Sequence, residues 1–207
     1  INWYVNMKTK PGDGIIVLTP VYYPFLDAIR DNGRQLISCD LVRKDKVYHI
    51  DYADFEKKIV DNKVKLFILS SPHNPVGRVW KKEELEQLLA ICRKHQVFVV
   101  ADEIHHDLIM PGYEHTEILN IPGYTDMLVV LTAGSKTFNL AGCKNSIADV
   151  SRLIKESNYS DRVKSSLYGF FIDPIPAIQK LSYELMTRDI LLSQQYEKNF
   201  RRLSDLQ

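Results

Sequence analysis

The chain has 207 residues and a formal net charge of +1, with 45% hydrophobic and 26% charged residues. This composition is typical of a globular protein with a full core, and the balanced charge disfavours nucleic acid and anionic membranes as partners. Because no apolar run approaches the ~20 residues of a membrane span and the first ten residues form no secretory signal, we expect a cytoplasmic protein.

Short apolar runs alternate with helical patterns along the chain. Continuous apolar runs predict buried strands at 15–18, 65–69, 97–101 and 127–132, and 35–41 is a further extended piece before a charged, hairpin-like stretch. Helices are predicted after residues 21–25, ending near residue 32 with Gly33 as a cap, and at 52–61 and 82–95. Residues 146–156 fit either a strand passing into a helix or one continuous helix, and 176–200 predict a helix.

Strands separated by helices predict an α/β fold with a mostly parallel sheet and helices on both faces. In such sheets ligands bind outside the carboxyl ends of the strands. Five polar or aromatic residues that follow predicted strands map to that edge, although they are far apart in the sequence: Tyr22, Asn74, Asp102, His105 and Lys136. Their convergence predicts a functional site there.

Lys136 follows the apolar run 128–131, where we expect its ammonium group to lose solvation. An amine that is freed in this way can form a Schiff base with a carbonyl compound. A lysine that merely begins a solvated loop is the simplest alternative, because single motif matches are often false positives. The other polar residues at the same sheet edge favour the functional interpretation.

Pyridoxal phosphate is a cofactor whose protein partners are an imine-forming lysine and an acid at the pyridine nitrogen. Lys136 and Asp102 fit these two roles. The amide of Asn74 and the imidazole of His105 are suited to hydrogen-bond the phenolic oxygen, and a tyrosine can stack on the ring.

Two further residues are suited to the cofactor phosphate, Ser135 as a hydroxyl donor and Lys144 as a point charge. Asp102 and its neighbours Glu103, His105 and His106 form an alternative metal cluster, but no second ligand group at the usual spacing follows, so we predict no metal site.

Several conspicuous side chains have simpler structural interpretations. His73 and His115 are predicted to be loop histidines with local hydrogen bonds, and three aromatic residues are predicted to be packing residues: Tyr23, Phe25 and Trp80. The three cysteines are odd in number and widely spaced, which predicts reduced thiols: Cys39, Cys92 and Cys143. Cys92 falls on an apolar helical stripe and is predicted to lie in the core, whereas Cys143 is close to the candidate site.

Three motifs together make the sequence resemble the fold-type I pyridoxal-phosphate enzymes of aminotransferase class I and II. They occur in the family's order and at its approximate spacing, Ser-Pro-His-Asn-Pro-Val-Gly-Arg at 71–78, Asp-Glu-Ile-His at 102–105 and Ser-Lys-Thr-Phe-Asn-Leu-Ala-Gly at 135–142. The resemblance implies roles for seven residues in cofactor binding, with Lys136 also catalytic: Tyr22, Asn74, Asp102, His105, Ser135, Lys136 and Lys144. Ala133 stands where many relatives carry a serine that contacts the phosphate.

The resemblance is greater to one branch, the cystathionine β-lyases and related carbon-sulfur lyases. His105 replaces the tyrosine of typical aminotransferases, and residues 20–24, Pro-Val-Tyr-Tyr-Pro, agree with the branch, with Tyr22 as the stacking ring. This implies an α,β-elimination on a sulfur amino acid by a homodimer. An aminotransferase acting on an amino acid and a 2-oxo acid is the leading alternative, and a non-catalytic module with this fold is another.

The resemblance also implies a domain arrangement. We expect residues 1–150 to form the core of the pyridoxal-phosphate-binding large domain and 151–207 to continue as helix towards a C-terminal small domain. The resemblance places the phosphate-binding loop before residue 1 and the small domain after Gln207. The sequence also begins without methionine in what resembles the end of a helix, so we expect the chain to be a fragment. As an isolated 207-residue chain, it is expected to bind cofactor weakly and to lack activity.

Overall fold

A computed structural model describes residues 1–139, 141 and 147–148. The chain divides into two compact units, Ile1–Asp149 and Val150–Gln207, and all the described residues belong to the first. Within these residues, no helix has both the length and the apolar character that crossing a membrane requires. The helix predicted at 176–200 lies outside the described residues, as does most of 146–156.

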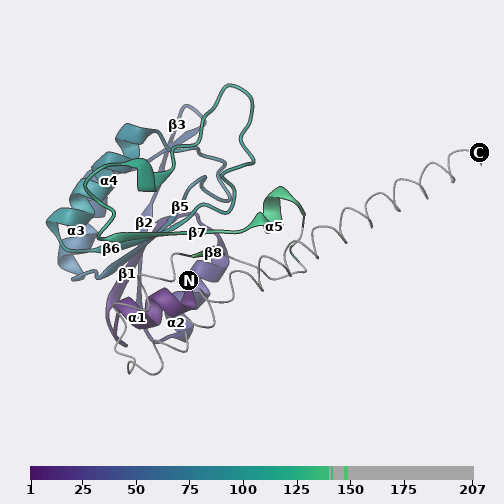
Figure 1. The fold of residues 1–207 in the computed structure, drawn as a ribbon. Coiled ribbons are helices and arrows are strands. Elements are labelled where there is room, and N and C mark those ends of the chain that lie inside the picture. Colours follow the sequence, from purple (N-terminus) through teal and green to yellow (C-terminus); the bar gives the residue numbers. More distant parts are fainter. Residues whose placement is uncertain (140, 142–146, 149–207) are drawn as a thin grey trace, which may run out of the picture. The chain divides into compact units, whose positions relative to one another are not determined.

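A six-stranded sheet in the order β2-β1-β5-β6-β7-β8 organises the first unit (Figure 1). Its first five strands are parallel and β8 pairs antiparallel with β7. The strands of this sheet are β1 (Gly14–Thr19), β2 (Gln35–Asp40), β5 (Leu66–Ser70), β6 (Phe98–Asp102), β7 (Leu128–Thr132) and β8 (Ile147–Ala148). A separate antiparallel hairpin consists of β3 (Val42–Lys44) and β4 (Val47–His49).

Helices cover both faces of the sheet, with α3 and α4 on one side and α1 and α2 on the other (Figure 1). The helices are α1 (Asn2–Lys8), α2 (Tyr23–Asp31), α3 (Tyr52–Asp61), α4 (Lys82–Lys94) and the short α5 (Gly134–Thr137), with a 3₁₀ turn η1 at Ile118–Asn120. The predicted α/β class is therefore confirmed. The predicted strands and helices differ from the observed ones by a residue or two at their ends, where the sequence pattern is least informative.

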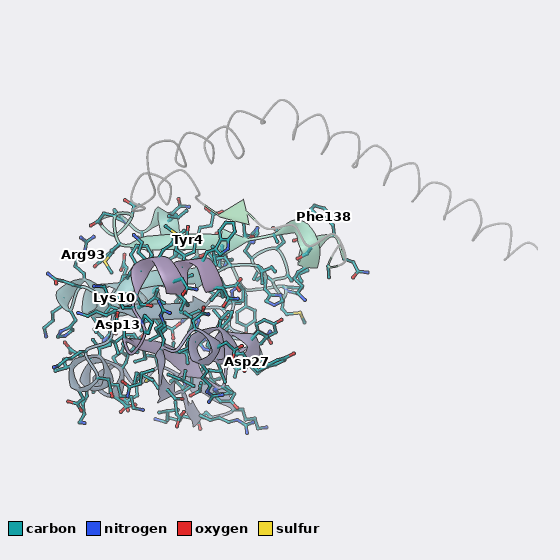
Figure 2. The ribbon with its side chains drawn as sticks, turned by 90° about the horizontal axis from the view of Figure 1, so that it is seen from below. Tyr4, Lys10, Asp13, Asp27, Arg93 and Phe138 are labelled. Atoms are coloured by element: carbon teal, nitrogen blue, oxygen red, sulfur yellow. The ribbon has the colours of Figure 1, made fainter. Side chains whose placement is uncertain are left out.

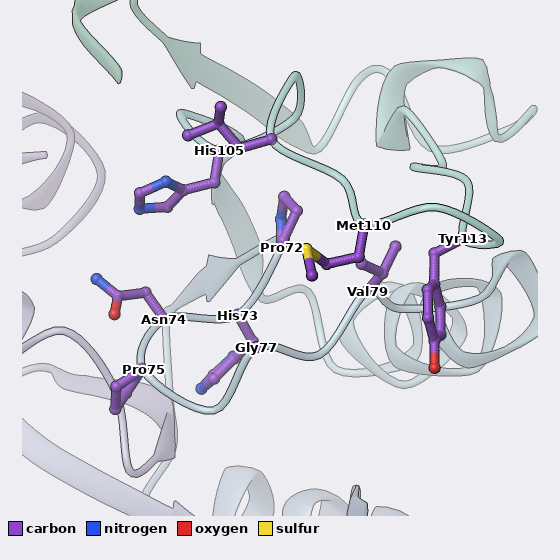
Figure 3. Close-up of a pocket in the computed structure, with 10 residues that line it drawn as sticks. Pro72, His73, Asn74, Pro75, Gly77, Val79, His105, Met110 and Tyr113 are labelled. Carbon is purple, nitrogen blue, oxygen red and sulfur yellow. The ribbon is translucent and has the colours of Figure 1, made fainter. Parts of the chain in front are cut away.

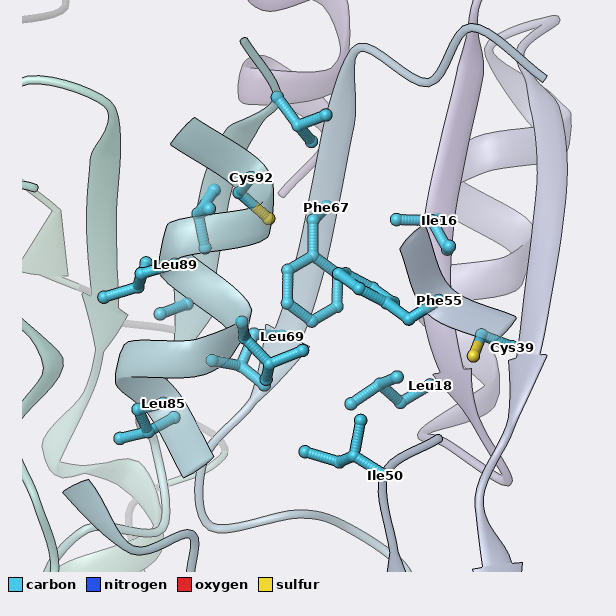
Figure 4. Packing of buried hydrophobic residues seen from close by; sticks show 14 of the residues in the cluster. Ile16, Leu18, Cys39, Ile50, Phe55, Phe67, Leu69, Leu85, Leu89 and Cys92 are labelled. Atoms are coloured by element: carbon cyan, nitrogen blue, oxygen red, sulfur yellow. The ribbon is translucent and has the colours of Figure 1, made fainter. Parts of the chain in front are cut away.

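Alternate residues of the central strands enter opposite cores. Phe67 and Leu69 of β5 face α3 and α4, where the Phe67 ring packs edge-on against Phe55 with centroids 5.0 Å apart (Figure 4). On the other face, Tyr4 of α1 is buried against the sheet and stacks on Phe98 of β6 (Figure 2). This two-residue period decides on which side of the sheet each residue at a strand end projects.

The cysteine predictions are confirmed where the structure describes them. Cys39 and Cys92 are buried free thiols, and Cys92 lies in the core beneath α4. Burial raises the pKa of Cys39 to about 12 and also raises the pKa of Cys92, so both thiols stay protonated at neutral pH. Cys143 lies outside the described residues.

Truncation of a central ring tests this core. We expect Phe67→Ala to lower the free energy of unfolding by about 3–5 kcal/mol, because Phe67 is fully buried and its removal leaves a cavity under α3 and α4. The measurement is urea unfolding followed by the fluorescence of the buried Trp80. Val60→Ala is the control, because Val60 is half exposed and its truncation should change the free energy by less than about 0.5 kcal/mol. Equal losses in the two variants would contradict the assignment of Phe67 to the core.

Candidate active site

The strand order places a topological switch point between β1 and β5. β1 pairs with β2 on one side and with β5 on the other. The connections that leave the carboxyl ends of β1 and β5 lead to α2 and α4, which lie on opposite faces of the sheet (Figure 1). This is where parallel α/β sheets form their ligand-binding crevice. The loop carrying Tyr22 follows β1, and the loop carrying Asn74 follows β5.

His73 joins these two loops. Its Nε2 lies 2.9 Å from the carbonyl oxygen of Pro20, and because a carbonyl only accepts hydrogen bonds, Nε2 carries the proton. Burial lowers the pKa of His73, so the ring is neutral at pH 7. The prediction of a purely local hydrogen bond was wrong, since this contact spans 53 residues of sequence. No pattern in the sequence predicted the contact between His73 and Pro20.

The turn that carries Asn74 is held from beneath by Ser70 and Trp80. Ser70 Oγ donates to the carbonyl of Pro72 at 3.0 Å and accepts from the backbone N–H of Asn74 at 3.2 Å. The fully buried Trp80 donates its indole N–H to the carbonyl of Ser70 at 2.9 Å. Trp80 is thus a packing residue, as predicted, and also fixes the start of the site loop.

Asp102 and Glu103 project to opposite sides of the sheet, because consecutive residues at a strand end alternate between its faces. Glu103 is buried and accepts from the backbone N–H of Ile118 at 3.0 Å, and its carboxylate lies 3.5 Å from His115 Nε2. Neither ring nitrogen of His115 makes a hydrogen bond within the described part, so the prediction of local hydrogen bonds was wrong for this residue too. Among residues the structure describes, no group of three His, Cys, Asp or Glu side chains is arranged to hold a metal ion.

Asp102 ends β6 in register with Ser70 of β5 and Leu131 of β7. Burial raises the pKa of the Asp102 carboxyl, while a hydrogen bond from the backbone N–H of Ile104 at 3.1 Å and the positive charge that His105 carries when protonated lower it. The charged carboxylate is therefore held where it is poorly solvated. Such a group is stabilised by a cationic partner.

Asn74 and His105 line a cavity of about 430 Å³ at this edge of the sheet. Figure 3 shows the His105 imidazole and the Asn74 amide on the same side of this cavity, facing each other. Apolar side chains from the loop after β6 line the cavity with Val79, namely Leu108, Met110 and Tyr113, and the turn after β5 adds Pro72, His73, Pro75 and Gly77. The cavity thus combines hydrogen-bonding groups with apolar side chains, as small-molecule sites do.

The pKa of His105 depends on two charged residues of the candidate site. Burial lowers the pKa of His105, the carboxylate of Asp102 raises it, and the positive charge of Lys136 lowers it. His105 therefore lies within electrostatic reach of both Asp102 and Lys136, and its imidazole is neutral at pH 7.

The remaining predicted site residues have differing environments. Ser135 is buried, whereas Lys136 is exposed on α5. The prediction that its ammonium group is desolvated was therefore wrong, because α5 extends beyond the end of the strand.

Tyr22 is 44% exposed and its ring packs against the buried Phe25. Tyr23 is 69% exposed, so its interpretation as a packing residue was wrong, while that of Phe25 is confirmed. Lys144 lies outside the described residues.

The sequence and the fold are similar to those of known proteins. The model of the family aminotransferase class I and II matches residues 4–169, and the chain belongs to this family. Cystathionine beta-lyase PatB of Bacillus subtilis is 42% identical over 166 residues, which are 80% of this chain and 43% of that protein. The chain thus spans less than half the length of this curated relative.

Solved structures are also similar to this chain. Cystalysin from Treponema denticola, described as containing a pyridoxal 5'-phosphate cofactor, is similar with a TM-score of 0.69 and 49% identity over 71% of this chain and 38% of that chain. A putative aminotransferase from Clostridium difficile 630, described as PLP-bound, has a TM-score of 0.69 and 37% identity over 86% of this chain and 43% of that chain.

The electrostatic contact between Lys136 and His105 can be tested without any cofactor. In Lys136→Ala the pKa of His105 should rise, because a positive charge that disfavours the imidazolium is removed, and in Asp102→Asn it should fall. Titration of the imidazole signals by NMR measures both shifts, with the exposed His49 as an internal reference. A His105 pKa that is identical in wild type and Lys136→Ala would contradict the contact.

The burial of Asp102 predicts a stability effect with a defined sign. Because the folded state raises the pKa of this carboxyl, its ionised form is less stable in the folded than in the unfolded chain at pH 7. Asp102→Asn should therefore raise the melting temperature at pH 7, and the gain should shrink as pH falls towards the pKa of the unfolded chain, about 3.9.

Thermal unfolding at several pH values measures this difference. The control is Asp27→Asn, because Asp27 is exposed on α2 (Figure 2). A melting temperature lowered by Asp102→Asn at pH 7 would show that favourable contacts of the charged carboxylate outweigh its desolvation.

Proposed function

We propose that the protein binds pyridoxal 5′-phosphate and catalyses an α,β-elimination on a sulfur amino acid such as cystathionine, releasing a thiol. The observation that carries this proposal is that His105 lies within electrostatic reach of both Asp102 and Lys136 and lines the same cavity as Asn74. The 42% identity to a cystathionine beta-lyase favours this reaction.

The residues at this edge fit the cofactor by their chemistry. Asp102 presents a poorly solvated carboxylate that a protonated pyridine nitrogen would stabilise. Asn74 and the neutral His105 offer an amide and an imidazole on one cavity wall, suited to a phenolic oxygen. Tyr22 presents a half-exposed ring for stacking, and Ser135 and Lys144 are proposed to contact the phosphate.

The chemistry is divided between the cofactor and this chain. When bound, pyridoxal phosphate supplies an electron sink for the negative charge that develops on the α-carbon of the substrate. Lys136 holds the cofactor covalently through Nζ and, when free, moves the proton at the α-carbon. Asp102 keeps the pyridine nitrogen protonated, and the hydrogen bonds from Asn74 and His105 orient the ring.

The proposal also covers the domain organisation, the oligomeric state and the localisation of the protein. Residues 1–150 form the core of the cofactor-binding large domain, and the protein acts as a homodimer in the cytoplasm, as its resemblance to the carbon-sulfur lyases implies. The buried free thiols of Cys39 and Cys92 are compatible with a reducing compartment. Light scattering of the full-length protein tests the dimer.

Transamination is the second candidate, because a putative aminotransferase is 37% identical over 86% of the chain. Elimination and transamination share the removal of the α-proton, so the residues described above serve both. They differ in their products. Incubation with cystathionine yields pyruvate and a thiol in the first case, whereas a new amino acid from an added 2-oxo acid indicates the second.

Borohydride reduction of the full-length protein with pyridoxal phosphate tests the role of Lys136. We expect the trapped adduct to map to the peptide containing Lys136, and Lys136→Ala to lose the adduct and at least about a hundredfold of the rate. Lys65→Ala is the matched control, because Lys65 is exposed next to the amino end of β5, at the opposite edge of the sheet. An adduct on another lysine, or a fully active Lys136→Ala, would refute the assignment.

A further inference from the structure

Two threonines that flank Lys136 are hydrogen-bonded to consecutive residues of the loop after β6. Thr132, at the end of β7, has its Oγ1 3.2 Å from His106 Nδ1. Thr137, in α5, donates its hydroxyl to Asp107 Oδ2 at 2.7 Å, a contact that spans 30 residues of sequence. The segment carrying Lys136 is therefore fastened on both sides to the loop that begins at Asp102.

The anchoring loop is itself fixed to the sheet. His106 Nδ1 lies 2.6 Å from the carbonyl oxygen of Glu103, which only accepts, so Nδ1 carries the proton. The hydroxyl oxygen of Thr132 is therefore a second acceptor of this N–H. The backbone N–H of Glu103 in turn donates to the carbonyl of Leu131 in β7 at 2.8 Å. On the other side of the ring, His106 Nε2 lies 3.3 Å from Asp107 Oδ1. Asp107 thus presents one oxygen to His106 and the other to Thr137.

The short helix α5 needs such an anchor. It has four residues, about one turn, and an isolated turn of helix is unstable in water. Lys136 is exposed, and Phe138, directly after the helix, is 69% exposed and buries little surface (Figure 2). Within the described part of the chain, the hydrogen bond from Thr137 to Asp107 is the side-chain hydrogen bond that ties α5 to another segment.

We propose that Asp107, acting through Thr137, is a positioning residue that fixes Lys136 relative to Asp102 and His105. The inference rests on the proposed role of Lys136. Asp107 does not line the cavity, so its effect passes through α5 and not through contact with a ligand. Since a displacement of a reacting group by about 1 Å can cost on the order of a hundredfold in rate, loss of this anchor should lower kcat.

The test uses single and double variants of the full-length protein loaded with pyridoxal phosphate. Thr137→Val removes the hydroxyl at nearly constant volume and should lower kcat about 10- to 100-fold with little change in KM. Thr137→Ser restores the donor and should return kcat to within about threefold of wild type. Asp107→Ala removes this contact and also the one to His106, so it should be at least as slow as Thr137→Val. The double variant should be no slower than Asp107→Ala, because Thr137→Val removes nothing that Asp107→Ala has not already removed.

A second readout does not depend on the cofactor. Hydrogen exchange of the peptide covering 133–138 in the cofactor-free protein should be faster in Thr137→Val than in wild type, and normal again in Thr137→Ser. Thr116→Val, at a half-buried loop threonine, is the control for exchanging a hydroxyl for a methyl group and should alter neither kcat nor this exchange.

The outcomes separate this inference from the proposed function. If the wild-type protein is active and Thr137→Val has the same kcat, the positioning role alone is overturned. The same holds if Thr137→Ser fails to restore the kcat lost in Thr137→Val, or if the losses in kcat are additive in the double variant. A wild-type protein whose trapped adduct forms on a lysine other than Lys136 overturns the proposed function and, with it, this inference.

Discussion

The alignment of three neighbouring strand ends is the constraint on which the candidate site depends. Ser70, Asp102 and Leu131 stand side by side in the parallel register of β5, β6 and β7. The loops that follow these strands therefore start at the same level of the sheet and carry Asn74, His105 and Lys136 to one edge. A shift of β6 by one residue would turn Asp102 to the opposite face, because side chains alternate along a strand.

Hydrogen bonds between loops complete what the register begins. His73 ties the turn after β5 to the loop after β1, Trp80 supports the same turn from the core, and Asp107 reaches the segment after β7. The first two of these side chains are buried, so their polar contacts are shielded from competition with water. The loops at the candidate site are thus joined to one another and to the core by hydrogen bonds.

The sequence predicted the architecture because its signals are local. Continuous apolar runs specify buried strands, and the helical stripe through Cys92 specifies α4. Prediction from the sequence failed where the environment of a residue depends on contacts between distant segments. Nothing in the residues around His73 indicates a partner at Pro20, and the exposure of Tyr23 and Lys136 follows from the course of the chain beyond a strand end. The different environments of the Asp102 and Glu103 carboxylates could not be predicted without knowing which face of the sheet each core covers.

The position of β1 between β2 and β5 also governs how the chain can fold. β1 ends at Thr19, but its second partner begins only at Leu66, after α2, the hairpin and α3. During synthesis, one edge of an almost wholly buried apolar strand has no partner until residues 66–70 arrive, and closing this long loop costs entropy before pairing compensates for it. The nascent chain therefore exposes a strand edge that other molecules can join, which makes this stage the most vulnerable to aggregation.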